Sequence, residues 1–157
     1  MQRRTLTFAS LTDAVHEAEG MLANGYIKVG SWSLGQLCGH LANWLTYPID
    51  GFPRMPLILR PVMWTLRNTI GRRQFDAYLR NKAMPPGKPT IPQSVPPADG
   101  NDAAAVASFI QAVDQLLNYD GPFHPSPLFG LLTKEELLAI HCVHTAHHLS
   151  FLVPKQV

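Results

Sequence analysis

Four of the seven histidines in this chain lie within eight residues near its C-terminus, at His141, His144, His147 and His148. The apolar periodicity around them predicts a helix that begins at Thr133. With His144 set at zero, His148 lies at about 40°, His141 at about 60° and His147 at about −60° on the helical wheel. His144 and His148 alone have the i, i+4 spacing that lets two imidazoles on one helix reach a single cation. The sequence therefore predicts a metal site on this helix.

A second candidate residue, His40, lies on a helix predicted from about residue 33 to 47. A single half-buried histidine is common, so His40 alone would be interpreted as a structural residue. Its helix face, however, carries a polar stripe that borders the core, made of Gln36, Asn43 and Tyr47. Because burying such groups without partners costs free energy, we expect a shared cavity that holds water or a metal.

Roles can be assigned to the polar and aromatic residues that should face this cavity. His141 is the best-positioned general base, and Tyr47 and Asn43 are further catalytic candidates. Gln36 and Trp44 are candidates for contact with the substrate. If His141 were a fourth ligand the site would be closed and structural, whereas a His141 that stands back would leave an open position for chemistry.

Other nucleophiles and ligands are excluded by position. Cys38 and Cys142 each lie about 160° from the histidine on their own helix, so both should face away from the site. His16 lies on a charged face and His124 in a loop, and both are interpreted as structural. The sequence contains no Gly-rich phosphate loop, Gly-x-Ser-x-Gly turn or His-Glu-x-x-His motif.

The chain as a whole predicts a single all-α domain over residues 1–157. Helices are expected at about 10–23, 33–47, 101–118 and 133–152, and no convincing alternating strand is found. A Pro-rich crossover at about 52–100 joins the second and third of these helices and contains one or two short helices within 56–81. Four amphipathic helices with one long connection describe a four-helix bundle with a crossover.

Charge and apolar patterning limit which partners and which cellular compartment are expected. Eight of the thirteen basic residues lie between 54 and 88 beside one acid, Asp76. A solvated surface explains this most simply; a pocket for an anionic substrate, or a weak membrane or nucleic-acid contact, is the sharper alternative. We expect no nucleic-acid partner and no membrane partner, because no binding motif is present and the most apolar segment, 55–66, is short and interrupted. The absence of a signal-peptide pattern and the two cysteines indicate the cytoplasm.

Three segments resemble the DinB-like superfamily, and most closely its branch catalogued as domain of unknown function 1569. They are Trp32-Ser33-Leu34-Gly35-Gln36-Leu37-Cys38-Gly39-His40-Leu41-Ala42, the stretch from His124-Pro125 through Leu128-Phe129-Gly130-Leu131-Leu132-Thr133-Lys134-Glu135-Glu136, and His144-Thr145-Ala146-His147-His148-Leu149. The Met84 to Gly87 segment also fits, so the resemblance spans nearly the whole chain.

The resemblance implies an up-down four-helix bundle with three histidines around a divalent metal, commonly nickel or zinc. By position, the ligands would be His40, His144 and His148, in agreement with the helical wheel. Many relatives follow the last histidine with Arg-Gly-Gln, whereas Leu149-Ser150-Phe151 stands here, so any role of those polar residues is not transferred. Characterised relatives include metal-dependent transferases that activate a low-molecular-weight thiol such as bacillithiol or mycothiol.

Two functions follow as expectations. The first is a divalent-metal-dependent enzyme, of small-thiol transferase or hydrolase type, that acts on a small molecule through an open coordination position. The alternative is a non-catalytic bundle with a structural or vestigial metal site that acts through partner binding. Exposed bundle faces would also allow a homodimer.

Overall fold

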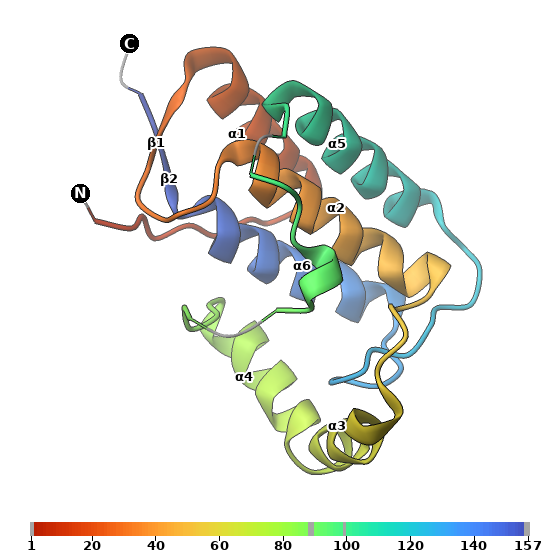
Figure 1. The fold of residues 1–157 in the computed structure, drawn as a ribbon. Helices are drawn as coiled ribbons and strands as arrows, with labels where there is room; N and C mark the ends of the chain where they lie inside the picture. The colour runs from red at the N-terminus through yellow and green to blue at the C-terminus, as the bar shows by residue number, and fades with distance from the viewer. Residues whose placement is uncertain (1, 88–89, 99, 156–157) are drawn as a thin grey trace.

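The computed structural model describes residues 2–87, 90–98 and 100–155 and is mostly helical, as the sequence predicts (Figure 1). The four long helices are α1 (Leu11–Asn24), α2 (Leu34–Asp50), α5 (Asp102–Asn118) and α6 (Lys134–Leu149). Three of them begin with a reciprocal capping box, in which a Ser or Thr side chain accepts from a backbone amide three residues later. The cap residues are Ser10, Ser33 and Thr133, while Asn101 caps α5 through its side-chain oxygen.

The long helices share one hydrophobic core, to which α1, α2 and α5 contribute most side chains and α6 contributes Leu149. Its largest fully buried members include Met21, Phe109 and Leu116. A second, smaller core forms where Phe75 packs against Leu132, Leu137 and Ile140. Burial of apolar area at about 25 cal/mol per Å² is the main favourable term that holds these helices in place.

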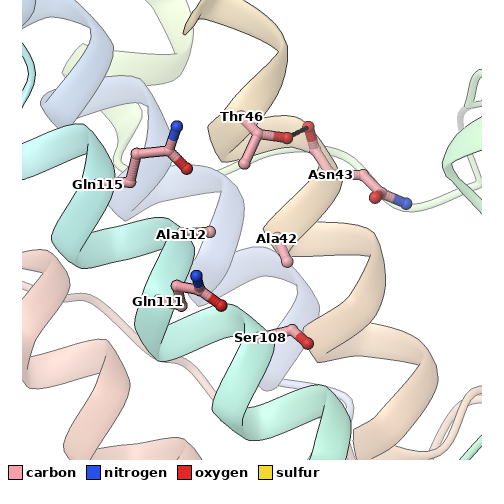
Figure 2. Close-up of a pocket in the computed structure, with 7 residues that line it drawn as sticks. All are labelled: Ala42, Asn43, Thr46, Ser108, Gln111, Ala112 and Gln115. Atoms are coloured by element: carbon pink, nitrogen blue, oxygen red, sulfur yellow. Dashed lines mark hydrogen bonds between the residues drawn. The ribbon is translucent and has the colours of Figure 1, made fainter. Parts of the chain in front are cut away.

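The two helices α2 and α5 approach closely through small residues. A side chain at Gly35 would collide with the Asp102 carboxylate, whose Oδ1 accepts a 2.7 Å hydrogen bond from the Gly35 amide. Further along, an open groove of about 250 Å³ remains between the two helices (Figure 2). Its lining is largely polar: Ala42, Asn43, Thr46, Ser108, Gln111, Ala112 and Gln115.

The connection between α2 and α5 contains a series of short helical elements. These are η1 (Leu57–Leu59), α3 (Arg60–Leu66), the π-helical turn η2 (Arg67–Gly71), α4 (Arg72–Asn81) and η3 (Pro92–Ser94). Figure 1 places α3 at the end of the molecule away from both chain termini. Lys88 and Pro89, which belong to the predicted basic and Pro-rich segments, lie outside the described residues.

Two strands correct the expectation that the chain contains none. β1 (Tyr26–Lys28) pairs antiparallel with β2 (Leu152–Pro154), with Ile27 opposite Val153. As a consequence, α6 ends at Leu149 rather than at about residue 152. Strands of three residues are too short to show an alternating pattern, so only the tertiary pairing reveals them.

The end of α2 also differs from the prediction, because the helix passes through Pro48 and ends at Asp50 rather than at about Tyr47. Pro48 lies in the last turn, where its missing N–H removes a single helical hydrogen bond. Its carbonyl oxygen accepts a 2.7 Å hydrogen bond from the backbone amide of His124, and the Gly51 amide closes the helix on the Tyr47 carbonyl. No described helix is long and apolar enough to cross a membrane.

Candidate metal centre

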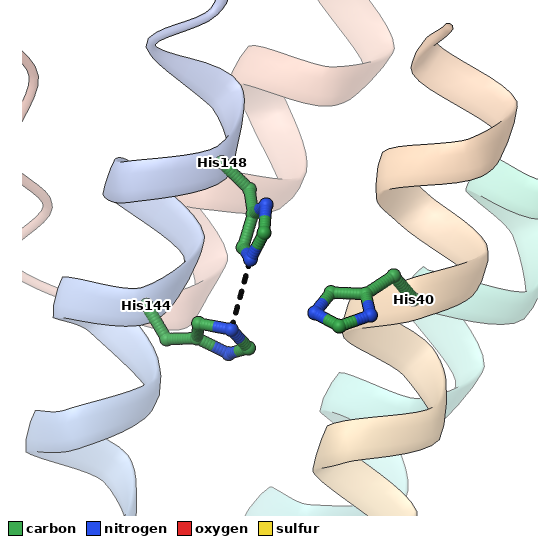
Figure 3. Close-up of side chains that lie close together, drawn as sticks. All are labelled: His40, His144 and His148. Carbon is green, nitrogen blue, oxygen red and sulfur yellow. Dashed lines mark hydrogen bonds between the residues drawn. The ribbon is translucent and has the colours of Figure 1, made fainter. Parts of the chain in front are cut away.

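Three imidazoles from α2 and α6 converge between the two helices (Figure 3). His40 comes from α2, and His144 and His148 come from successive turns of α6. One ring nitrogen from each lies within 4.8 Å of the other two, and the Nε2 atoms of His144 and His148 are 3.0 Å apart. Because metal–nitrogen bonds are about 2.0–2.1 Å, two ligands of one ion lie at most about 4.2 Å apart, so small side-chain rotations would close the group on an ion.

His40 is oriented for this task by a backbone contact. Its side chain is fully buried, and its Nδ1 lies 3.0 Å from the Ser94 carbonyl oxygen. A carbonyl can only accept, so Nδ1 carries the proton and Nε2 presents a lone pair. That Nε2 is buried and has no hydrogen-bond partner among the described residues. A proton held on one nitrogen by a carbonyl, with the other nitrogen free, is the usual arrangement of a metal-binding histidine.

Aromatic rings enclose the three histidines. Trp32 stacks nearly parallel on His148, with ring centroids 5.8 Å apart, and meets the His40 ring edge-on at 5.2 Å. Trp44 lies 5.7 Å from the His144 ring and 6.2 Å from the His40 ring. Tyr47 in turn packs against Trp44 at 5.7 Å. These rings shield the imidazoles from water, which disfavours their charged forms.

Desolvation keeps the cluster neutral. Burial lowers the pKa of His40 to about 4, although the Ser94 carbonyl bond opposes the shift. Burial, followed by repulsion from neighbouring imidazoles, lowers the pKa of His144 and of His148 well below the usual value. Only a neutral imidazole can bind a metal, so at neutral pH all three are in the state that coordination requires.

His141, the predicted general base, stands back from the three-histidine group. It lies one turn before His144 on α6, is buried, and its ring centroid is 6.4 Å from that of His144. Burial lowers the pKa of His141 to about 4, so the imidazole is neutral at neutral pH. It forms no hydrogen bond with any residue in the described part of the chain.

The other residues assigned to the site divide into two groups. Trp44 packs against the His144 ring, and Tyr47 packs against Trp44. Gln36 is engaged in the α2 cap, where its Oε1 accepts from the Ser33 amide. Asn43 lies along the groove between α2 and α5 rather than against the imidazoles. The predicted polar stripe therefore does not converge on the histidines as one surface.

The residues excluded from the site lie where the sequence predicts. Cys38 is buried in the main core, and Cys142 packs against that core half-buried; both thiols are free. Burial raises the pKa of Cys38 to about 12 and that of Cys142 to about 11, which makes either a poor nucleophile. His16 and His124 are exposed.

Three contributors were missed by sequence reasoning: Trp32, Ser94 and Arg3. The Arg3 guanidinium stacks on Phe151 at 4.3 Å and donates to the Ser150 hydroxyl and the His147 carbonyl. Its charge is one of the smaller causes that lower the pKa of His148. All three residues precede helices or lie in connections, where no periodicity indicates a direction. The one available signal was the position of Trp32 next to the α2 cap.

Comparison with known proteins places the chain in a family. A family model described as a protein of unknown function (DUF1569) matches residues 1–155. The chain belongs to the DUF1569 family. The matched region of this DUF1569 protein contains all three converging histidines and both tryptophans that cover them. Neither the comparison with curated proteins nor that with solved structures gave a match.

Proposed function

We propose that this DUF1569 protein is a divalent-metal-dependent enzyme of small-thiol transferase or hydrolase type. The observation that carries the proposal is the convergence of His40, His144 and His148, with a buried His40 Nε2 that has no hydrogen-bond partner in the described part of the chain. A buried nitrogen of this kind costs free energy unless something occupies the position that it faces. The three residues would hold one ion, most naturally nickel or zinc, since imidazole suits both.

An enzyme is favoured over a structural site by the number of ligands. Structural zinc sites are normally closed by four protein ligands, whereas catalytic sites have three and an open position. Here the group contains three histidines, and His141 lies outside it. An ion held by three neutral ligands would lower the pKa of a bound water or thiol and so supply a nucleophile at neutral pH.

The surrounding residues would bind and orient the substrate. Trp32 and Trp44 exclude water from the imidazoles, and Trp44 offers a ring surface to a substrate. The neutral His141 is a candidate proton acceptor. Tyr47 and Asn43 are further catalytic candidates, and Gln36 is a candidate for contact with the substrate. Arg3 adds positive charge beside a site whose three histidines are neutral. An anionic small molecule, such as a carboxylate-bearing thiol, would therefore fit best.

The finer features of the fold belong to the same proposal. We take α1, α2, α5 and α6 to form an up-down four-helix bundle of DinB-like type, with the connection between α2 and α5 as its crossover. A cytoplasmic location and a homodimer are part of this proposal, and nucleic acid is not among the expected partners.

The test is a cobalt titration that reports whether the three-histidine site binds an ion and whether that ion keeps a free coordination position. Tag-free protein loaded with Co²⁺ should show the strong visible bands of a low-coordinate site, and glutathione should then add a sulfur-to-cobalt charge-transfer band. Binding of azide without any response to thiols would favour the hydrolase type. A loaded site that responds to neither thiols nor azide would be closed, which would support the alternative of a structural ion in a non-catalytic bundle.

A further inference from the structure

An apolar segment that no described residue covers lies in the connection between α2 and α5. Within η1 and α3 the exposed fractions reach 74% for Leu57, 82% for Ile58, 54% for Val62 and 62% for Trp64. No residue of η1 or α3 is buried, and the main neighbours of α3 are the two adjoining elements, η1 and η2. We call residues 57–64 the apolar tip; Figure 1 shows it at the far end from both termini.

Basic residues flank the apolar tip in the sequence. Arg54 precedes the tip and Arg60 lies within it, and Arg67, Arg73, Arg80 and Lys82 follow it along the chain, whereas Asp76 is the single acid between residues 54 and 82. Of the basic side chains in this stretch, Arg72 is ion-paired, with Asp76 and Glu136. The other six form no ion pair within the described part of the chain.

The shape of the tip indicates what could cover it. Leu57, Ile58 and Leu59 are consecutive in a 3₁₀ turn, so their side chains point in different directions, yet all three are exposed. Lipid can surround such a protruding turn on every side. Trp64 suits the boundary between headgroups and acyl chains, and arginines suit anionic headgroups.

We propose that the apolar tip docks this protein on the surface of an anionic lipid membrane. Leu57, Ile58 and Trp64 insert at the headgroup boundary, and the exposed Arg54 and Arg60 beside them contact lipid phosphates. Docking of this kind requires no spanning helix. It takes up the weak membrane contact that the basic segment 54–88 left open as an alternative, in place of the expectation of no membrane partner, and it rests on the exposure of residues 57–64.

Vesicle co-sedimentation of the full chain tests the proposal. Binding to vesicles of phosphatidylcholine with phosphatidylglycerol should exceed binding to phosphatidylcholine alone by about tenfold or more. The triple variant Leu57→Ser, Ile58→Ser, Trp64→Ser should lose most of this binding. The control Leu117→Ser removes an exposed leucine from α5 and should bind as the native chain does. Because all these side chains are exposed, each variant should keep the native circular dichroism spectrum.

A second readout identifies the inserted residue. Brominated anionic lipids should quench native fluorescence more than that of Trp64→Phe, since Trp32 and Trp44 are packed against the histidines. The proposal is overturned if the native chain does not bind anionic vesicles, or if the triple variant binds equally well. A dimer seen by sedimentation velocity without vesicle binding, and lost in the triple variant, would overturn it by assigning the tip to self-association.

Discussion

One ring nitrogen of His40 is hydrogen-bonded, whereas the other has no partner among the residues that the structure describes. The Ser94 carbonyl fixes the proton on Nδ1, and the unpartnered Nε2 faces the α6 histidines. A carbonyl at that place is supplied by η3, so a segment of the Pro-rich connection positions a residue of α2. At the residue scale, the candidate site therefore consists of three histidines that could hold a metal, one orienting carbonyl and the rings that enclose them.

Replacing Trp32 tests the contribution of this enclosure. Trp32→Leu removes the ring that stacks on His148 and contacts His40 edge-on. Since an aromatic pair contributes about 0.5–1.5 kcal/mol, metal affinity should fall about 2- to 10-fold. Competition titration against a chromophoric chelator measures the change. Trp64→Leu, which alters an exposed tryptophan, should leave the affinity unchanged; an equal loss in both variants would refute a specific role for Trp32.

The buried His141 predicts a pH dependence of stability. Its pKa is about 4 in the folded protein and about 6.5 when exposed, so between these values the unfolded chain binds a proton that the folded chain does not. The free energy of unfolding should therefore fall as the pH is lowered from about 6.5 to about 4, by up to about 3 kcal/mol from this residue.

Urea denaturation of metal-free protein measures this effect. His141→Leu removes the titrating group, so the variant should lose less stability between pH 7 and pH 5 than the native chain. The remaining dependence in the variant comes from the other buried imidazoles, His40 among them. Identical pH dependence in the two proteins would show that His141 is not titrating as its burial requires.

At the scale of elements, the packing of η2 against the 126–130 loop fixes the start of α4. Gly71 is buried, and a Cβ atom there would overlap the Leu128 carbonyl oxygen. This contact is to backbone, which cannot rotate away. The turn therefore depends on the absence of a side chain rather than on an unusual dihedral angle at Gly71, whose φ is −56°.

Alanine substitutions at two helical glycines separate these effects. Gly71→Ala should destabilise the protein by about 1–3 kcal/mol, because it overpacks a buried contact. At Gly20, within α1, an added Cβ would have no described neighbour within 4 Å, so Gly20→Ala should stabilise the protein by about 0.5–1 kcal/mol through helix propensity. Thermal and urea unfolding report both changes. A Gly71→Ala protein as stable as the native chain would contradict the close approach to Leu128.

Local chemistry explains which elements could be predicted from the sequence. Ser33 with Gln36, and Thr133 with Glu136, form the capping boxes that the sequence predicts, because a cap depends on residues three apart. The β1–β2 pair joins residues more than 120 positions apart in the chain, and the continuation of α2 past Pro48 depends on packing in its last turn. Both features are set by tertiary contacts, which periodicity does not report.

At the scale of the whole molecule, the candidate site lies between α2 and α6 and takes residues from four separate parts of the chain. The i, i+4 pair on α6 could be predicted from spacing alone, whereas His40 was a candidate because of the polar stripe on its helix and was assigned as a ligand by the family resemblance. Trp32 and Ser94 could not be predicted, since their places depend on how the connections cross the helices. The enclosure of the site is therefore a property of the folded chain.

The most direct test of the metal centre is elemental analysis of tag-free protein beside the variant His40→Ala, His144→Ala, His148→Ala. We predict about one equivalent of nickel, zinc or another divalent transition metal in the native protein and none in the variant. The control variant His16→Ala, His124→Ala, which lacks two exposed histidines, should retain the native metal content. No metal in the native protein even after incubation with divalent ions, or equal metal in the native and triple-variant proteins, would contradict the proposed centre.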